Sequence, residues 1–205
     1  MTRLLMILAA GLAVWSGCAR SQPDYFPLVP GAVRIMHVHQ RIVTPAGANE
    51  TSYVAAVEVV RGERDVPPIG RVWVVESPSD SARFFYRRSG DSILEIQPGR
   101  GGRPKPVLYL LLPLRVGKRW HDTGAEAAER VVESLEDVSV PLGRFEACYR
   151  VVTTHEDIDM KVATWFAPGV GVVKRERRLA WGEDSLRREV ERFEELVEYR
   201  LPKGE

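Results

Sequence analysis

Short runs rich in β-branched and aromatic residues recur along most of the chain, and glycine, proline, aspartate, asparagine or serine separates them. Apolar and polar positions that alternate within such runs are typical of half-buried β-strands. The pattern predicts strands over residues 32–43, 52–60, 71–76, 83–88, 92–97, 107–112, 129–136, 144–155, 162–167 and 171–178. Many short strands with turns at near-regular spacing predict an all-antiparallel β fold.

Two of these runs indicate that the sheet is curved. Residues 32–43 carry apolar and polar side chains on both faces, and residues 171–178 begin with valines and end in Lys-Arg-Glu-Arg-Arg. Strands whose ends enter solvent fit a curved antiparallel sheet or open half-barrel better than a compact sandwich. We therefore expect a mainly β fold of this kind, formed by a single domain over residues 25–205.

The segment 185–199 is open to two interpretations. Leu186, Val190, Phe193 and Val197 recur at helical spacing, and Ser185 is suited to cap such a helix. A strand with a bulge is the alternative, and the family resemblance given below slightly favours it.

The N-terminal residues resemble a bacterial export signal that ends at a lipid-carrying cysteine. Arg3 supplies the positive charge, residues 4–14 are continuously apolar, and Ser16 and Gly17 are the small residues found before a cleavage point. Cys18 follows directly, as in the lipobox of bacterial lipoproteins. An ordinary anchor helix is the alternative, but this run is shorter than the roughly 20 apolar residues that span a bilayer.

This interpretation divides the N-terminal region into a lipoprotein signal peptide, residues 1–17, and a lipidated tether, residues 18–24. Trp15 stands where such signals usually have leucine. The Cys18 thiol, and often the new amino terminus, would carry acyl chains such as palmitate. Ala19, not aspartate, follows Cys18. By resemblance to Gram-negative lipoproteins, this predicts the periplasmic face of the outer membrane.

Charge and cysteine content narrow the function classes. The chain has 29 Lys and Arg against 28 Asp and Glu, so no overall field recruits nucleic acid. No second long apolar segment follows the signal, which predicts an anchored protein that does not span the membrane. With Cys18 lipidated, Cys148 has no partner for an internal disulfide, and its apolar surroundings predict a buried, reduced thiol. A catalytic thiol and an intermolecular disulfide are less favoured.

No motif brings catalytic or metal chemistry. His37 and His39 share one strand face, a spacing that some zinc sites use, but no spacing supplies a third ligand. Residues 156–159 lack the glycine and closing glutamate of a calcium loop, and no serine lies in a Gly-x-Ser-x-Gly motif. Residues 99–106 form a basic loop without the features of a phosphate loop; it either contacts anionic lipid or wall polymer or is simply solvated. We expect no catalytic residue, metal or cofactor.

Aromatic residues are the more informative set. Neighbours such as Phe84 and Phe85 point to opposite faces of a strand, so both faces of that part of the sheet need cover. One face packs a core, and the other meets the C-terminal segment or lines an apolar concavity for an acyl chain or a partner. The candidate surface consists of Phe84, Tyr86, Trp120 and Trp165. Core packing is the alternative, and it places Trp120, Tyr149 and Trp165 in the interior.

Four motifs occur in order along the chain. They are Tyr-Phe-Pro-Leu-x-x-Gly (25–31), Leu-Pro-Leu-x-x-Gly-x-x-Trp (112–120), Val-x-Val-Pro-x-Gly-x-Phe-x-Ala-Cys-Tyr-x-Val (138–151) and Thr-Trp-Phe-Ala-Pro-Gly-Val-Gly-Val-Val-Lys (164–174). Together they resemble a group of poorly characterised secreted bacterial lipoproteins labelled TapB-like. The resemblance implies a strongly curved antiparallel sheet, similar to the open half-barrels of lipoprotein carriers, and implies no catalytic residues.

These observations predict a non-enzymatic, lipid-anchored protein of the cell envelope whose β domain binds an apolar ligand, such as a lipid, or an envelope protein partner. The alternative is a structural or assembly component with no small ligand. An enclosed apolar cavity favours the first, and a filled interior with an exposed patch favours the second.

Overall fold

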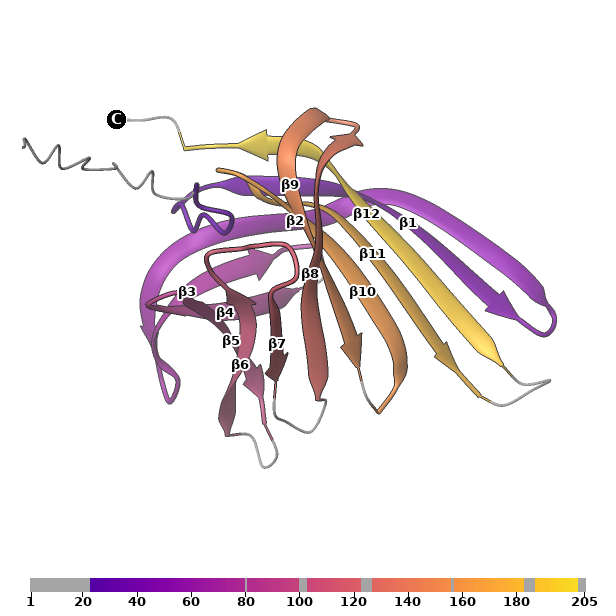
Figure 1. Ribbon diagram of the computed structural model, residues 1–205, viewed down its shortest axis with the longest axis horizontal. Helices are drawn as coiled ribbons and strands as arrows, with labels where there is room; N and C mark the ends of the chain where they lie inside the picture. Colours follow the sequence, from indigo (N-terminus) through magenta and orange to yellow (C-terminus); the bar gives the residue numbers. More distant parts are fainter. Residues whose placement is uncertain are drawn as a thin grey trace, which may run out of the picture.

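The computed structural model describes residues 23–79, 81–99, 103–122, 127–155, 157–182 and 187–202, and these form one sheet of twelve antiparallel strands without a helix (Figure 1). The strands are β1 Val33–Thr44, β2 Gly47–Val66, β3 Gly70–Ser77, β4 Ala82–Ser89, β5 Ser92–Pro98, β6 Pro104–Leu111, β7 Arg119–Asp122, β8 Ala128–Val140, β9 Gly143–His155, β10 Asp159–Ala167, β11 Gly171–Trp181 and β12 Arg188–Arg200. Within the described ranges there is thus no helix long and apolar enough to cross a membrane.

The order of strands across the sheet is β6-β5-β4-β3-β2-β1-β12-β11-β10-β9-β8-β7. Strands that are neighbours in the sheet are also consecutive in the chain, except β1 and β12, which pair with each other. The edge strands β6 and β7 are consecutive in the chain and lie close together, although no ladder hydrogen bonds join them. The sheet therefore curls into a nearly closed half-barrel (Figure 1), which confirms the predicted curved antiparallel fold.

The ten predicted runs coincide with strands, and two further strands complete the sheet. β7 is only four residues long and was not predicted. The segment 185–199 is a strand from Arg188 onward, whereas Ser185 and Leu186 lie outside the described residues. A bulge in the β1–β12 pairing passes over Val197, so that Leu196 faces Met36 and is fully buried. The apolar residues show a helical spacing because two polar residues, Arg192 and Glu194, take inward-facing positions in this strand and interrupt the alternation of apolar and polar side chains.

The segment before β1 closes one end of the half-barrel. Tyr25 and Phe26 are buried, and the Phe26 ring lies 5.0 Å from Tyr86 and 5.5 Å from Tyr109. Asp24 accepts hydrogen bonds from Arg88, at 2.9 and 3.1 Å, and its carbonyl accepts one from the Gly169 amide. Asp24, the residue at which the predicted tether ends, is therefore bound to the domain.

The tip of the β8–β9 hairpin covers the same region from another side. The Leu142 amide donates to the Leu196 carbonyl at 3.0 Å, so the tip lies across β12. Val138 and Val140 at the end of β8 belong to the same buried cluster as Leu196. This end of the interior is consequently packed with apolar side chains, and a cavity lies further along β8 and β9.

Two similar turns lead into β1 and β7. The Ala32 amide donates to the Val29 carbonyl and the Lys118 amide donates to the Arg115 carbonyl, both at 3.0 Å. The third residue of each turn is a glycine with positive φ, 82° for Gly31 and 85° for Gly117. This is the geometry of a type II turn, which explains why glycine recurs at the same position before both strands.

Cys148 lies fully buried in the main apolar cluster and has no disulfide partner among the described residues. Burial raises the pKa of its thiol to about 11, so it is protonated near neutral pH. This confirms the predicted burial of the thiol, and its reduced state stays a prediction. Trp120 and Trp165 are also buried, whereas Tyr149 is partly buried and packs against the ring of Tyr25.

Candidate ligand-binding cavity

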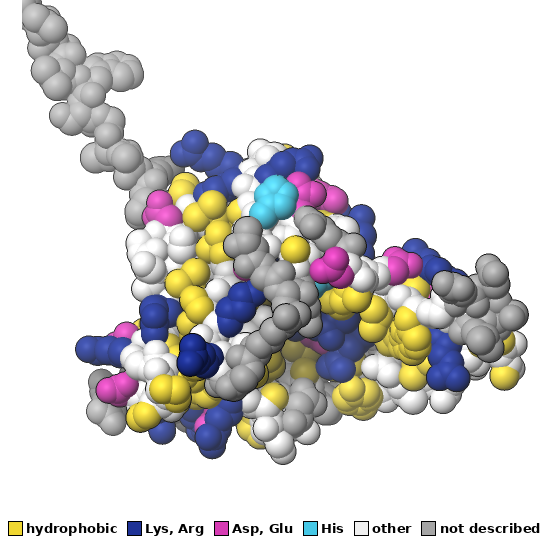
Figure 2. Space-filling view, turned by 90° about the horizontal axis from the view of Figure 1, so that it is seen from below, with side chains coloured by type: hydrophobic (Ala, Val, Ile, Leu, Met, Phe, Trp, Pro, Cys, Tyr) yellow, Lys and Arg dark blue, Asp and Glu magenta, His cyan; other side chains and the backbone are white. Residues whose placement is uncertain are grey.

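A cavity of about 380 Å³ lies on the concave face of the sheet, among inward-facing side chains of β2, β4, β5, β6 and β8 to β11. Its walls are mainly polar. The aromatic lining residues are Phe84, Tyr86 and Tyr109, the charged ones are Glu58, Glu95, Arg130, Arg175 and Arg177, and the remainder are Gln97, Thr153, His155, Met160, Val162 and Thr164. Figure 2 views the molecule from the end at which β8 and β10 begin, and arginine and lysine side chains alternate there with hydrophobic ones.

The two-residue period of the strands brings these side chains together. Phe84 and Tyr86 are two apart on β4, and Arg175 and Arg177 are two apart on β11. The register then places lining residues directly opposite one another, as in Tyr86 with Glu95. The charged residues therefore point inward on strands that are not adjacent in the sequence.

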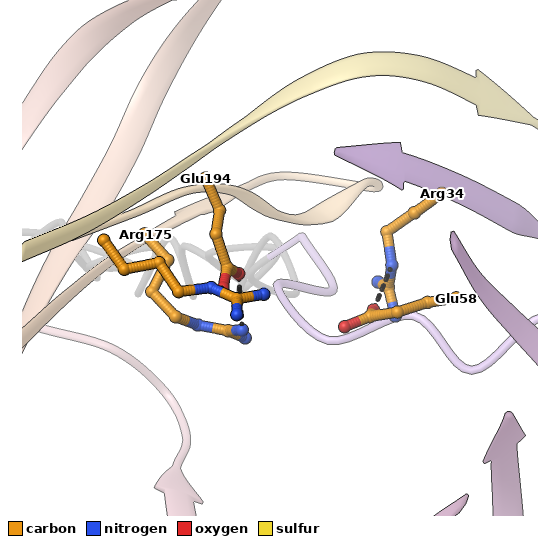
Figure 3. Close-up of polar contacts among 5 residues, drawn as sticks. Arg34, Glu58, Arg175 and Glu194 are labelled. Carbon is orange, nitrogen blue, oxygen red and sulfur yellow. Dashed lines mark hydrogen bonds and ion pairs between the residues drawn. The ribbon is translucent and has the colours of Figure 1, made fainter. Parts of the chain in front are cut away.

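An ion pair between Arg34 and Glu58 joins β1 to β2 at the cavity (Figure 3). The Arg34 guanidinium donates to the Glu58 carboxylate at 3.2 Å, donates to the Val170 carbonyl at 3.3 Å, and is only 5% exposed. Gly171 has a φ of +89°, and a Cβ at this position would lie 2.7 Å from Arg34 Nη1. A glycine is therefore needed here for the buried guanidinium to fit.

A second buried network joins β11 and β12 (Figure 3). The Glu194 carboxylate is 5% exposed and accepts hydrogen bonds from Arg175 Nη1 at 2.9 Å and Arg192 Nε at 2.7 Å. Burial alone would raise the pKa of Glu194, but the two guanidinium groups outweigh it and lower the pKa. Burial opposes the charge of Arg175, and the Glu194 carboxylate overcomes this and raises the Arg175 pKa. Both groups are therefore charged.

Tyr86 and Tyr109 form the aromatic side of the cavity. Their rings lie 5.6 Å apart, and Tyr109 continues the cluster to Phe166 at 6.3 Å. Burial raises the pKa of both hydroxyl groups, most strongly for Tyr86. Both tyrosines consequently remain protonated and are available as hydrogen-bond donors.

Arg130 differs from the other buried arginines because its charge is not fully compensated. The residue is 8% exposed, and its Nη1 atom is buried and has no hydrogen-bond partner among the described residues. Trp120 lies directly opposite it in the β7–β8 pairing, and Trp120 Nε1 is also buried with no partner in the described part of the chain. Burial lowers the pKa of Arg130, although Asp122 acts in the opposite direction. Two buried donors on neighbouring strands are thus left without an acceptor.

The structure divides the four aromatic residues of the predicted surface. Phe84 and Tyr86 line the cavity, and Trp120 is buried beside the lining residue Arg130. Trp165 lies on the outer face, where its Nε1 donates to Glu136 at 2.6 Å and Arg150 and Lys174 each lie 5.2 Å from its ring. The idea that these residues contact a ligand or partner stays a prediction.

Sequence reasoning missed the charged residues of the cavity. Glu58, Glu95, Arg130, Arg175 and Arg177 all lie within predicted strands, but a charge in a strand is normally assigned to the solvated face. The available signal was that Glu58 and Glu95 each have apolar neighbours on both sides, whereas Arg175 and Arg177 lie among other charged residues and gave no such signal.

The paired histidines lie on the outer face of β1. His37 Nε2 is 2.9 Å from the Ser52 hydroxyl, and the His39 ring lies 6.1 Å from Phe193. In the part of the chain that the structure describes, no three His, Cys, Asp or Glu side chains are grouped to hold a metal ion. The absence of a metal stays a prediction.

Comparisons with known proteins give limited information about the family. A family model described as DUF3108-like matches residues 114–178, which is less than half of the chain, and nothing supports the TapB-like resemblance specifically. No curated protein matches the sequence.

Two solved structures resemble the fold. One is a "putative exported protein with YmcC-like fold" from Bacteroides fragilis, 16% identical, covering 87% of this chain and 99% of that one with a TM-score of 0.49. The other is a "putative lipoprotein" from Parabacteroides distasonis, 13% identical, covering 88% and 100% with a TM-score of 0.41. At these values no property of either protein is transferred to this chain.

Proposed function

We propose that this protein is a non-enzymatic, lipid-anchored protein of the cell envelope that holds a small ligand in the cavity on its concave face. The observation that carries the proposal is the cavity itself, because it combines open space on the concave face with convergent polar groups, beside an interior cluster of packed apolar side chains. Its polar walls change the ligand expected from the sequence, since a purely apolar molecule would leave these groups without partners.

The same geometry supports binding more than catalysis. Arg34 neutralises Glu58, Arg175 and Arg192 neutralise Glu194, and the raised pKa values keep Tyr86 and Tyr109 protonated. None of these groups is held ready to accept a proton near neutral pH. Fixed charges and neutral donors are instead suited to recognise the polar part of a ligand.

Filling the cavity should remove the bound ligand. Thr153 lines the cavity, and Thr154, the next residue on β9, is exposed on the opposite face. Thr153→Trp is expected to abolish the mass of the copurifying ligand in native mass spectra of envelope-purified protein, whereas Thr154→Trp should retain it. Thermal melting checks that both variants fold, since overpacking costs about 1–3 kcal/mol. If the wild-type protein carries no mass beyond its acyl groups, the structural or assembly role is favoured instead.

The anchor is tested separately, because Cys18 and residues 1–17 lie outside the described residues. Cys18→Ser is expected to abolish incorporation of labelled palmitate and to release the protein from the membrane fraction or stall its export. A variant that stays labelled and membrane-bound would contradict the lipobox interpretation. The periplasmic face of the outer membrane is the proposed location, and fractionation of the wild-type protein tests it.

A further inference from the structure

We infer that the ligand is an anionic amphiphile, with one carboxylate or phosphate group bound by Arg130 and Arg177 and an alkyl chain lying along an apolar row beside them. This inference rests on the proposed function and specifies the chemical class of the ligand.

Arg130 carries the argument for a negative charge. A buried guanidinium that lacks an acceptor for Nη1 is unfavourable in a folded protein, because its desolvation is not compensated. An anion in the cavity would supply the acceptor that the described residues do not provide, and Trp120 Nε1 on the neighbouring strand is a second donor with no acceptor among them. Asp122 contributes favourably to the charge of Arg130 but makes no hydrogen bond with it in the described structure.

Two carboxylates at the cavity are already paired with arginines, and the third, Glu95, favours the charge of Arg130 but makes no hydrogen bond with it in the described structure. Glu58 is held by Arg34, Glu194 by Arg175 and Arg192, and Glu95 accepts a hydrogen bond from Gln97 at 3.0 Å.

Arg177 adds a second cation on the row of residues that begins at Arg130. Arg130 pairs with Thr153, Thr153 with Val162 and Val162 with Arg177, so the two arginines face the cavity from β8 and β11. Arg177 makes no hydrogen bond or ion pair within the described part of the chain. Desolvation at the cavity lowers its pKa although part of the side chain is exposed, and the nearby Arg175 and Arg192 lower the pKa further. Because these cations repel one another, a bound anion would relieve the repulsion.

The apolar part of the ligand is indicated by four side chains in register. Ile42 pairs with Val190, Val190 with Leu179, and Leu179 with Met160, so they form one row across β1, β12, β11 and β10. Met160 lines the cavity, so the row lies on the concave face, and all four side chains are half-buried. Three interstrand spacings of about 4.8 Å give the row a length of about 14 Å, enough to support an alkyl chain.

The row and the cations are adjacent. Arg192 lies two residues from Val190 on β12, and Arg177 lies two residues from Leu179 on β11. The register places the two arginines opposite each other, on the same face as Val190 and Leu179. Arg177 and Arg192 therefore flank the two middle members of the row, so a head group held at Arg177 would leave its alkyl chain lying along the row beside it. This arrangement matches a molecule with a charged head and an apolar tail, and it fits neither a free anion nor a neutral lipid.

The test uses the complete lipidated protein in a neutral maltoside detergent, so that a neutral alkyl chain is present in excess throughout. Dodecanoate, dodecyl phosphate, dodecanol and inorganic phosphate are added in turn, and binding is measured from the rise in Tm. Dodecanoate and dodecyl phosphate are expected to bind at least tenfold more tightly than dodecanol and than inorganic phosphate.

Arg130→Met keeps the volume of the side chain and removes its charge. It is expected to weaken binding of both anionic probes at least tenfold while leaving the Tm of the unliganded protein unchanged or raised, because an uncompensated buried charge is removed. Arg119→Met is the matched control, since Arg119 is exposed on β7 and pairs with Glu129 at 2.9 Å. Leu179→Ser should reduce the affinity for dodecyl phosphate toward that for inorganic phosphate.

Several results would overturn the inference. If dodecanol binds as tightly as dodecyl phosphate, the cavity does not recognise the charge. If inorganic phosphate binds as tightly as dodecyl phosphate, a free anion is the ligand. An Arg130→Met variant with lower Tm and unchanged affinity would give Arg130 a structural role. If none of the probes binds but Thr153→Trp still loses a copurifying ligand, this inference fails and the proposed function stands.

Discussion

Replacing Glu194 with glutamine is expected to lower the free energy of unfolding by about 3–5 kcal/mol, the range for breaking a buried ion pair by removing one partner. Glutamine keeps the size of the side chain but leaves Arg175 and Arg192 without a counter-charge in the interior. Urea unfolding followed by circular dichroism measures the change. Glu191→Gln is the control, because Glu191 lies on the same strand and pairs with the exposed Arg41 at 3.3 Å. An exposed pair contributes about 0–1 kcal/mol, and an equally small loss for Glu194→Gln would contradict the prediction.

The Glu194 carboxylate also makes the stability of the protein depend on pH in the acidic range. The pKa of Glu194 is lower in the folded state than its ordinary value. Its contribution to stability is therefore complete above the ordinary carboxyl range and is lost as the pH falls through the folded-state pKa. The difference in stability between wild-type protein and Glu194→Gln should shrink in that acidic range, and unfolding curves recorded at several pH values check this.

Replacing Trp165 with alanine is expected to cost about 3–5 kcal/mol, the range for removing a large buried aromatic side chain. Trp165 is 6% exposed and lies in the main apolar cluster. Its loss would also leave Glu136 without the indole donor.

Trp181→Ala is the matched control for this substitution, because Trp181 is 44% exposed at the end of β11 and should change stability by less than about 1 kcal/mol. Thermal and urea unfolding measure both variants. If Trp165→Ala folds normally but loses a copurifying ligand or partner, Trp165 belongs to a binding surface and not to the supporting core.

The strands were largely predictable from the sequence because their evidence is local. Val, Ile and aromatic residues mark strands wherever they lie in the sheet, and the turns before β1 and β7 repeat the same proline and glycine spacing. The exceptions have local reasons too. β7 is too short to show alternation, and β12 faces the interior with Arg192 and Glu194, which hides its apolar face.

The cavity was not predictable because its evidence is not local. Glu58 is an acceptable buried residue only because Arg34 lies on the adjacent strand, and the pairing of β1 with β2 brings the two together. Arg130 is compatible with either face of β8 until the curl of the sheet decides which face is enclosed. A period of two tells which side chains share a face, but not which face is inside.

The pairing of β1 with β12 has a consequence for how the chain is made. β1 is the first strand to emerge and β12 the last, yet they are neighbours in the middle of the sheet. Until β12 is complete, β6 to β1 and β11 to β7 are two separate hairpin series with no ladder between them. A chain that emerges from its N-terminus therefore keeps β1 unpaired on one side until β12 has emerged. Such long-range closure is slow, and it leaves an open strand edge that a chaperone would have to protect in the meantime.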